Sequence, residues 1–225
     1  MKFSIMDLAR EFECKQGEMV ILLEDIKSII VEHIQGEVFE GNCFYYHASL
    51  NMFPELYTKQ LNLYWYGKQA TRICEIGFNA GHSAMLMLLG NINKSIHFTV
   101  FDIGQHRYTT PCYNYIKQTY SNVLFEYIQG DSTVKMPEWI NANPQATSTY
   151  DLVHVDGGHS EYCASNDMKN ADLLLKPNGI MIIDDTDAPQ INKLVDMYVA
   201  SKKYAEMPAF KTFGYPHRII QKICV

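Results

Sequence analysis

Glu75-Ile76-Gly77-Phe78-Asn79-Ala80-Gly81 is the stretch of sequence that decides the fold. It continues the apolar residues Ile73 and Cys74, and this run predicts a short buried strand that ends in a turn. The two glycines are separated by three residues, and glycine permits both a positive φ and the close approach of a ligand to the backbone. A dinucleotide-binding turn has a further glycine between them, so the pattern disfavours a dinucleotide.

The chain after this turn alternates apolar strands with helices. We expect strands at 96–102, 123–128, 150–156 and 180–185, and helices from about residue 83 and at 113–120, 161–175 and 189–201. Asp187 is expected to cap the last helix. Two final strands, near Phe210 and at 218–225, are expected to pair across residues 214–216. Because alternating strands and helices form crossover units, we predict an α/β, Rossmann-like doubly wound fold. It would contain a mainly parallel seven-stranded sheet with an antiparallel C-terminal hairpin.

Residues 1–70 are expected to form an N-terminal helical and aromatic extension to the domain at 71–225. Apolar residues between 17 and 34 recur with the period of a helix. The aromatic-rich stretch that follows has no clean period. Its residues Tyr45, Tyr46 and Trp65 have two interpretations. They close over a substrate, or they pack the extension onto the sheet, and we favour packing for most of them.

The composition is that of a globular protein without a strongly charged surface. The chain has 225 residues, a formal net charge of -6 and 47% hydrophobic residues, and this balance gives no reason to expect a nucleic-acid partner. Its six cysteines are scattered without zinc spacing, which fits a reducing compartment. No segment has the pattern of a signal peptide or the length to span a bilayer. We therefore expect a cytoplasmic protein without a membrane partner.

Acidic side chains end, or closely follow, four of the expected strands: Asp102, Asp131, Asp156, Asp184 and Asp185. One acid at a strand end is routine turn chemistry. The carboxyl ends of parallel strands, however, meet at one edge of the sheet, where such folds bind ligands. Four strands that end in this way predict a shared acidic crevice.

The Glu-x-Gly-x-x-x-Gly turn, the strand-end Asp102 and the later Gly130-Asp131-Ser132 together resemble the class I S-adenosylmethionine-dependent methyltransferases. The resemblance covers the chain from about residue 72 onward and implies an S-adenosylmethionine-binding domain at 71–225. It implies that Asp102 holds the ribose and that Asp131 and Ser132 flank the adenine. The remaining cofactor-binding residues that it implies are Glu75, Gly77, Phe78, Asn79, Gly81, Ser83 and Asp156.

Asp156-Gly157-Gly158-His159, followed by Lys176-Pro177-Asn178-Gly179 and a strand that ends in two aspartates, is similar to a subgroup of small-molecule O-methyltransferases. This subgroup includes the catechol and macrolide-sugar types and binds a divalent cation. The resemblance implies that Asp156, Asp184 and Asp185 hold Mg²⁺, with Mn²⁺ or Ca²⁺ as alternatives. It also implies that the catalytic residues are His159, as general base, and Asp156.

The chemistry of these residues is consistent with that reaction. Three carboxylates brought together repel one another, and a hard cation with oxygen ligands relieves the repulsion. A cation that binds the acceptor oxygen also lowers the pKa of the hydroxyl group that must attack. Histidine titrates near neutral pH and can take the proton.

The leading hypothesis is therefore divalent-metal-assisted O-methylation of a small hydroxylated molecule. Two alternatives stay open: a metal-independent methyltransferase with another acceptor, and a catalytically inactive methyltransferase fold that serves as a binding module. No Asn-Pro-Pro-Tyr-type motif follows the fourth strand, which argues against methylation of nucleic-acid bases. The sequence leaves the acceptor and the oligomeric state open, and a homodimer is compatible with it.

Overall fold

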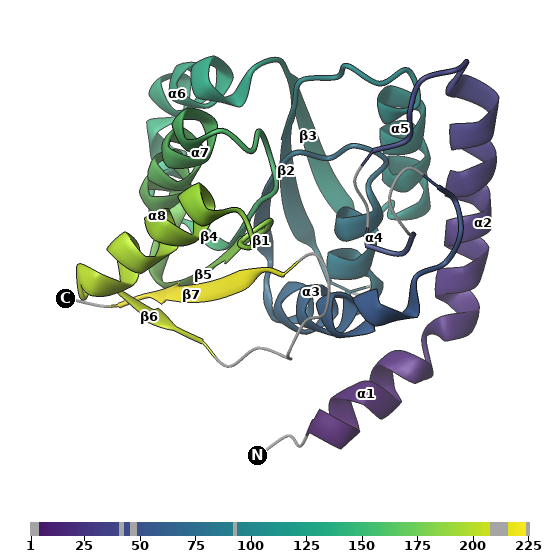
Figure 1. Cartoon of the computed structure of the whole chain (residues 1–225), viewed down its shortest axis with the longest axis horizontal. Helices are drawn as coiled ribbons and strands as arrows, with labels where there is room; N and C mark the ends of the chain where they lie inside the picture. The colour runs from purple at the N-terminus through teal and green to yellow at the C-terminus, as the bar shows by residue number, and fades with distance from the viewer. Residues whose placement is uncertain (1–4, 41–42, 46–48, 92–93, 208–215, 224–225) are drawn as a thin grey trace.

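A seven-stranded sheet in the order β3-β2-β1-β4-β5-β7-β6 forms the centre of the computed structural model (Figure 1). Residues 5–40, 43–45, 49–91, 94–207 and 216–223 are described. The strands are β1 Arg72–Ile76, β2 Ile96–Asp102, β3 Val123–Gln129, β4 Tyr150–Val155, β5 Leu175–Ile183, β6 Tyr204–Glu206 and β7 Arg218–Lys222. Strands β1 to β5 are parallel to one another, and β7 is antiparallel to both β5 and β6. The predicted doubly wound, mainly parallel sheet is confirmed.

Helices cover both faces of this sheet. They are α1 Ile5–Glu13, α2 Gln16–His33, α3 Tyr57–Gln69, α4 His82–Leu89, α5 Thr109–Thr119, α6 Ser132–Ala142, α7 Glu161–Leu174 and α8 Pro189–Ala200. Helices α6, α7 and α8 lie on one side of the sheet, and α2, α4 and α5 lie on the other (Figure 1). The buried side chains accordingly form two apolar clusters, one on each face. Because a central parallel strand is covered on both faces, β1 is buried along almost its whole length, including at the charged residue Glu75.

The N-terminal extension contributes to one of these clusters. Leu8 and Phe12 of α1 and Ile26 of α2 are buried in the same cluster as Phe98 of β2. Tyr45 is only 3% exposed, as the packing interpretation expects, and Trp65 is partly buried against the cluster. Tyr46 lies outside the described residues. No helix in the described part of the chain is both long enough and apolar enough to cross a membrane.

The structure corrects several predicted boundaries. Strand β5 begins at Leu175 instead of residue 180, so that it includes the Lys-Pro-Asn-Gly segment. The pairing register between β4 and β5 shifts at this segment, since Tyr150 pairs with Leu175 but Leu152 pairs with Ile180. Helix α6 and the early start of α5 were not predicted. The predicted cap at Asp187 is wrong, because α8 begins after Ala188 without a side-chain cap.

The structure confirms antiparallel strands at the C-terminus, where β6 pairs with β7. Phe210 and residues 214–215 of the predicted turn lie outside the described residues.

The order of the strands fixes where ligands bind. The chain runs outward from β1 through β2 to β3 and then returns to the other side of β1 as β4. The connections after β1 and β4 therefore diverge, and a crevice opens above the carboxyl ends of these two strands.

Candidate active site

The glycine turn after β1 is packed directly against the segment after β4. Gly77 has a φ of +87°, and a Cβ atom at this position would lie 1.9 Å from the carbonyl oxygen of Asp156. The Asp156 amide donates to the Ile76 carbonyl oxygen at 2.9 Å. Only glycine tolerates both the positive φ and this close approach. The turn therefore fixes Asp156 beside the loop that precedes α4.

Asp102, at the end of β2, holds the shape of that loop. Its Oδ2 accepts hydrogen bonds from the amides of Phe78 and Asn79 at 2.7 and 2.9 Å, and its Oδ1 accepts one from the amide of Gly104 at 2.6 Å. The side chain is 8% exposed. A carboxylate offers about four acceptor positions, so Asp102 retains one for a ligand hydroxyl.

Glu75 lies beneath the turn. It is fully buried, and its Oε1 accepts hydrogen bonds from Ser83 Oγ at 2.5 Å and from His154 Nδ1 at 3.0 Å. Burial raises the pKa of Glu75 despite these two partners. Glu75 thus supports the loop from below, in contact with two residues of the site.

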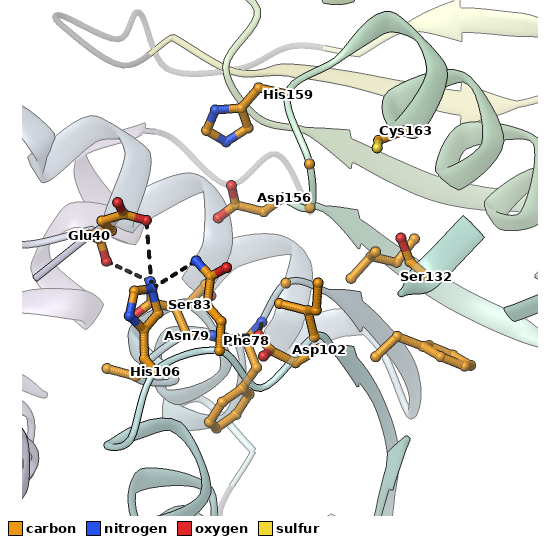
Figure 2. Close-up of a pocket in the computed structure, with 18 of the residues that line it drawn as sticks. Glu40, Phe78, Asn79, Ser83, Asp102, His106, Ser132, Asp156, His159 and Cys163 are labelled. Carbon is orange, nitrogen blue, oxygen red and sulfur yellow. Dashed lines mark hydrogen bonds and ion pairs between the residues drawn. The ribbon is translucent and has the colours of Figure 1, made fainter. Parts of the chain in front are cut away.

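A pocket of about 440 Å³ extends along the crevice, within the size range of small-molecule sites. Figure 2 shows Asp102 and His159 at opposite ends of it, with Asp156 between them. The predicted residues that line it are Gly77, Phe78, Asn79, Ser83, Asp102, Asp131, Ser132, Asp156 and His159. Four of the predicted residues do not line it: Glu75, Gly81, Asp184 and Asp185. Glu75 is buried, and Gly81 precedes α4 with a φ of +79°.

Asp131 combines a place in the pocket with a structural role. It is the N-cap of α6, and its Oδ1 accepts hydrogen bonds from the amide and hydroxyl of Thr133 at 2.9 and 2.7 Å. A capping carboxylate of this kind fixes the start of a helix. Asp131 and Ser132 therefore line the pocket from the N-terminus of α6.

His159, which lines one end of the pocket, is paired with Asp185. His159 Nε2 lies 2.8 Å from Asp185 Oδ2, and the His159 side chain is 66% exposed. The hydrogen bond with Asp185 raises the pKa of His159 from its ordinary value of 6.5. One ligand atom each of Asp156, His159 and Asp185 lie within 4.8 Å of one another. The His159–Asp185 pair therefore lies beside the carboxylate of Asp156.

Asp184 is turned away from this pair and into the protein. It forms a buried ion pair with Lys59 of α3, and the two side chains are 3% and 5% exposed. Burial alone would raise the pKa of Asp184, but the Lys59 ammonium outweighs it and holds this pKa below its ordinary value. Removal from water, together with the charge of Asp184, raises the pKa of Asp156 well above its usual range.

The three predicted metal ligands therefore belong to two different groups of donors. Asp156 and Asp184 group with His154, whereas Asp156 and Asp185 group with His159. Because an ammonium group already binds Asp184, the residues present do not fit a divalent cation held by all three aspartates.

Several residues of the site were not predicted from the sequence. Lys59 is the most important, and no local motif marks it. Glu40, Cys43 and His106 also line the pocket. His106 lies 3.6 Å from the Glu40 carboxylate, and Figure 2 shows this pair at the side of the pocket. The segment before α3 thus forms one wall of the site.

Comparison with solved structures places this fold among methyltransferases. An O-methyltransferase from Bacillus cereus in complex with SAH (S-adenosylhomocysteine) is 14% identical, with a TM-score of 0.62 and coverage of 90% of each chain. TomG, an O-methyltransferase from Streptomyces achromogenes in complex with SAM (S-adenosylmethionine), is 16% identical, with a TM-score of 0.55 and coverage of 72% of this chain and 77% of that one.

The similarity also extends to an enzyme with a different acceptor atom. The N-methyltransferase NodS from Bradyrhizobium japonicum is 12% identical, with a TM-score of 0.50 and coverage of 75% and 88%. At these identities the likeness shows the fold alone. Comparison with curated proteins gives no significant match.

The sequence itself carries the family assignment. The family model described as a methyltransferase domain matches residues 74–186, which is half of the chain and spans the glycine turn, Asp102, Asp156, His159 and Asp185. The chain belongs to this methyltransferase family.

Proposed function

We propose that the protein transfers the methyl group of S-adenosylmethionine to a hydroxyl oxygen of a small molecule. The cofactor would lie along the pocket, with its methionine end on the glycine turn. Its ribose would bind the free acceptor position of Asp102, and its adenine would lie by Asp131 and Ser132. Related structures that hold SAM or SAH support this choice of ligand.

The observation that carries the acceptor assignment is the His159–Asp185 pair beside Asp156. When His159 Nε2 donates to Asp185, the other ring nitrogen, Nδ1, has a lone pair that can accept a proton. The acceptor oxygen attacks the methyl carbon, the carbon–sulfur bond breaks toward sulfur, and the hydroxyl proton passes to His159. The sulfonium methyl is already electrophilic, so the protein mainly aligns the reactants and removes the proton.

Transfer of labelled methyl groups from S-adenosylmethionine to catechols, sugars and other small hydroxylated molecules tests this proposal. The expected products are methyl ethers. Methylated amines as the main products, or label incorporated into protein or nucleic acid instead, would contradict it.

The predicted divalent ion is a second candidate for the end of the pocket at His159. The observation that favours it is the group formed by Asp156, His159 and Asp185. An ion bound there would use His159 as a ligand and break its hydrogen bond with Asp185, so His159 could not also be the base. If His159 is the base, activity is expected to survive excess EDTA within about twofold. Loss of activity in EDTA and its return with Mg²⁺ would assign the ion instead.

Replacement of Asp102 tests the cofactor half of the site. Asp102→Ala removes three hydrogen bonds that shape the loop and the acceptor position for the ribose. We expect the dissociation constant for SAH to rise roughly 10- to 100-fold, because hydrogen bonds to charged groups are worth about 1.5–3 kcal/mol. Isothermal titration calorimetry measures this constant.

Asp151→Ala is the matched control for that experiment. Asp151 Oδ2 likewise accepts hydrogen bonds from two backbone amides, those of Thr71 and Arg72, at 2.7 and 2.9 Å. These amides lie at the opposite end of β1, far from the pocket. Asp151→Ala is expected to lower the melting temperature without changing SAH affinity. Equal losses of affinity in both variants would show that Asp102 acts only through stability.

A further inference from the structure

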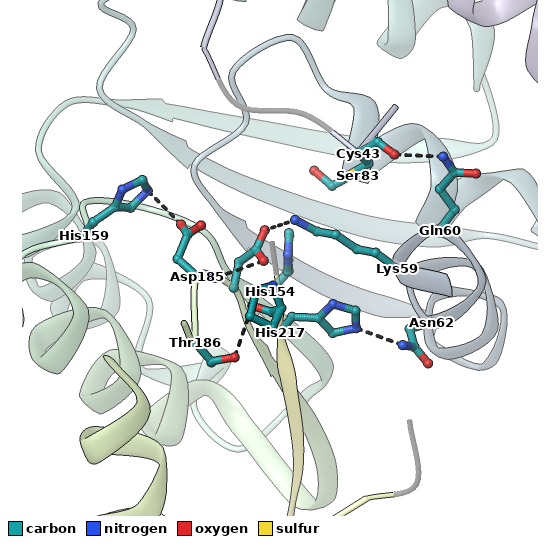
Figure 3. A network of polar contacts seen from close by, with 12 residues as sticks. Cys43, Lys59, Gln60, Asn62, Ser83, His154, His159, Asp185, Thr186 and His217 are labelled. Carbon is teal, nitrogen blue, oxygen red and sulfur yellow. Dashed lines mark hydrogen bonds and ion pairs between the residues drawn. The ribbon is translucent and has the colours of Figure 1, made fainter. Parts of the chain in front are cut away.

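Lys59 places a buried ammonium group at the carboxyl end of the sheet. Its Nζ donates a hydrogen bond to Asp184 Oδ2. The pair joins α3 of the N-terminal extension to the end of β5, across 125 positions of sequence. On the same helix, Asn62 Nδ2 lies 2.9 Å from His217 Nε2, and Figure 3 shows these polar contacts between α3 and the sheet. Helix α3 therefore buries polar side chains against the carboxyl end of the sheet.

The group around Asp184 has the donors of a metal site. One ligand atom each of His154, Asp156 and Asp184 lie within 4.8 Å of one another. Two carboxylates and an imidazole at this spacing suit Mn²⁺ or a similar divalent cation. His154 is fully buried, and among the described residues its Nε2 has no hydrogen-bond partner. What distinguishes this group from an open metal site is the positive charge of Lys59.

We propose that Lys59 is the resident cation of this group, so that Asp184 binds no divalent ion in this chain. An ion on Asp184 would lie a few ångströms from the ammonium group on the same carboxylate. Two cations at that separation repel strongly where water is excluded. The inference rests on the proposed function only in placing these residues beside the acceptor. It deepens that function by assigning the positive charge beside Asp184 to the Lys59 ammonium group instead of a divalent ion.

Binding of Mn²⁺ to the purified protein and its variants tests the inference. As a single substitution, Asp184→Asn is expected to change the Mn²⁺ affinity of the protein by less than threefold. Lys59→Met is expected to raise the affinity at least tenfold, because it leaves the Asp184 carboxylate without a cation. Adding Asp184→Asn to Lys59→Met should abolish this gain, and Lys59→Arg should keep the wild-type affinity. Calorimetry and the electron paramagnetic resonance signal of free Mn²⁺ both measure the affinity.

Lys68→Met is the matched control, since Lys68 lies on the same helix and pairs with Glu11 away from the site. It should leave Mn²⁺ affinity unchanged. Lys59→Met removes one partner of a buried ion pair and loses stability, so its melting temperature is measured with and without Mn²⁺. We expect Mn²⁺ to stabilise this variant more than the wild type.

Two results would overturn the inference. One is a wild type whose Mn²⁺ affinity falls at least tenfold with Asp184→Asn, because Asp184 would then be a ligand. The other is a Lys59→Met variant that neither gains affinity nor is stabilised by Mn²⁺. Because this experiment measures Mn²⁺ binding and not methyl transfer, a failure of the inference is distinguishable from a failure of the proposed function.

Discussion

His159→Ala is expected to lower kcat by a factor of roughly 10²–10⁴, the usual contribution of a positioned general base. Because His159 lies at the end of the pocket opposite Asp102 (Figure 2), the affinity for SAH should change by less than twofold. The side chain is 66% exposed, so the melting temperature should be unchanged. Steady-state kinetics with labelled S-adenosylmethionine measures kcat, and calorimetry measures the affinity for SAH.

The pH dependence of this reaction has a predicted direction. Only neutral His159 can accept the proton, so kcat should fall as the pH falls through the pKa of His159. The hydrogen bond with Asp185 raises this pKa above 6.5, which places the midpoint of the acid limb above pH 6.5. Asp185→Asn removes the negative charge and should move the midpoint to lower pH.

His33→Ala is a suitable control for these measurements. His33 lies at the end of α2, and its Nδ1 is 2.9 Å from the Ile29 carbonyl oxygen of its own helix. Its loss should leave both kcat and the pH profile unchanged. A His159→Ala variant with wild-type kcat would remove this residue from the mechanism.

Gly77→Ala is expected to have the largest effect on stability. The new Cβ atom would lie 1.9 Å from the carbonyl oxygen of Asp156, and the residue would have to adopt a φ of +87°. We expect a loss of roughly 3 kcal/mol in the free energy of unfolding, from overpacking together with left-handed strain. In a chain of this size, that loss lowers the melting temperature by about 6–12 °C. SAH binding should weaken as well, because relief of this steric clash displaces both the glycine turn and Asp156.

Gly36→Ala separates the two causes of that effect. Gly36 has a φ of +84°, but a Cβ atom there would meet nothing within 4 Å. The substitution should therefore cost only the conformational strain, about 1–2 kcal/mol, with unchanged SAH affinity. If the two variants lose the same stability, the packing of Gly77 against Asp156 is not a strong constraint. Thermal unfolding followed by circular dichroism makes the comparison.

Local sequence patterns predicted the sheet and the acidic residues at its carboxyl edge. Runs such as Ile73–Ile76 and the acids that end them are short-range features, and in a parallel sheet they determine which side chains share an edge. Asp102 and Asp156 could therefore be assigned to one crevice because each ends a strand of one mainly parallel sheet. Their separate roles, with Asp102 bonded to loop amides, depend on loop geometry that the pattern does not encode.

The pairing of Lys59 with Asp184 could not be predicted in the same way. The two residues are 125 positions apart, and no period relates them. Helix α3 also lacks a clean apolar stripe, because it is buried on almost every side, including at Lys59, Gln60 and Asn62. A helix buried all round does not show the amphipathic pattern by which helices are recognised.

The adjacent aspartates at the end of β5 show a further limit. The resemblance to metal-dependent O-methyltransferases implied that Asp184 and Asp185 would act together on one ion. Asp185, however, has a φ of +53°, and the turn of the chain directs it toward His159 while Asp184 points to Lys59. Neighbouring residues of like chemistry thus have different partners because the backbone turns between them.

A crystal structure of the protein grown with SAH, Mg²⁺ and a methylated or hydroxylated acceptor tests the central claim most directly. We predict that the acceptor oxygen lies within hydrogen-bonding distance of His159 Nδ1 and points at the sulfur of SAH. Lys59 would remain on Asp184. An acceptor oxygen bound to a metal ion that is held by Asp156, Asp184 and Asp185 together, with His159 turned away, would contradict the account.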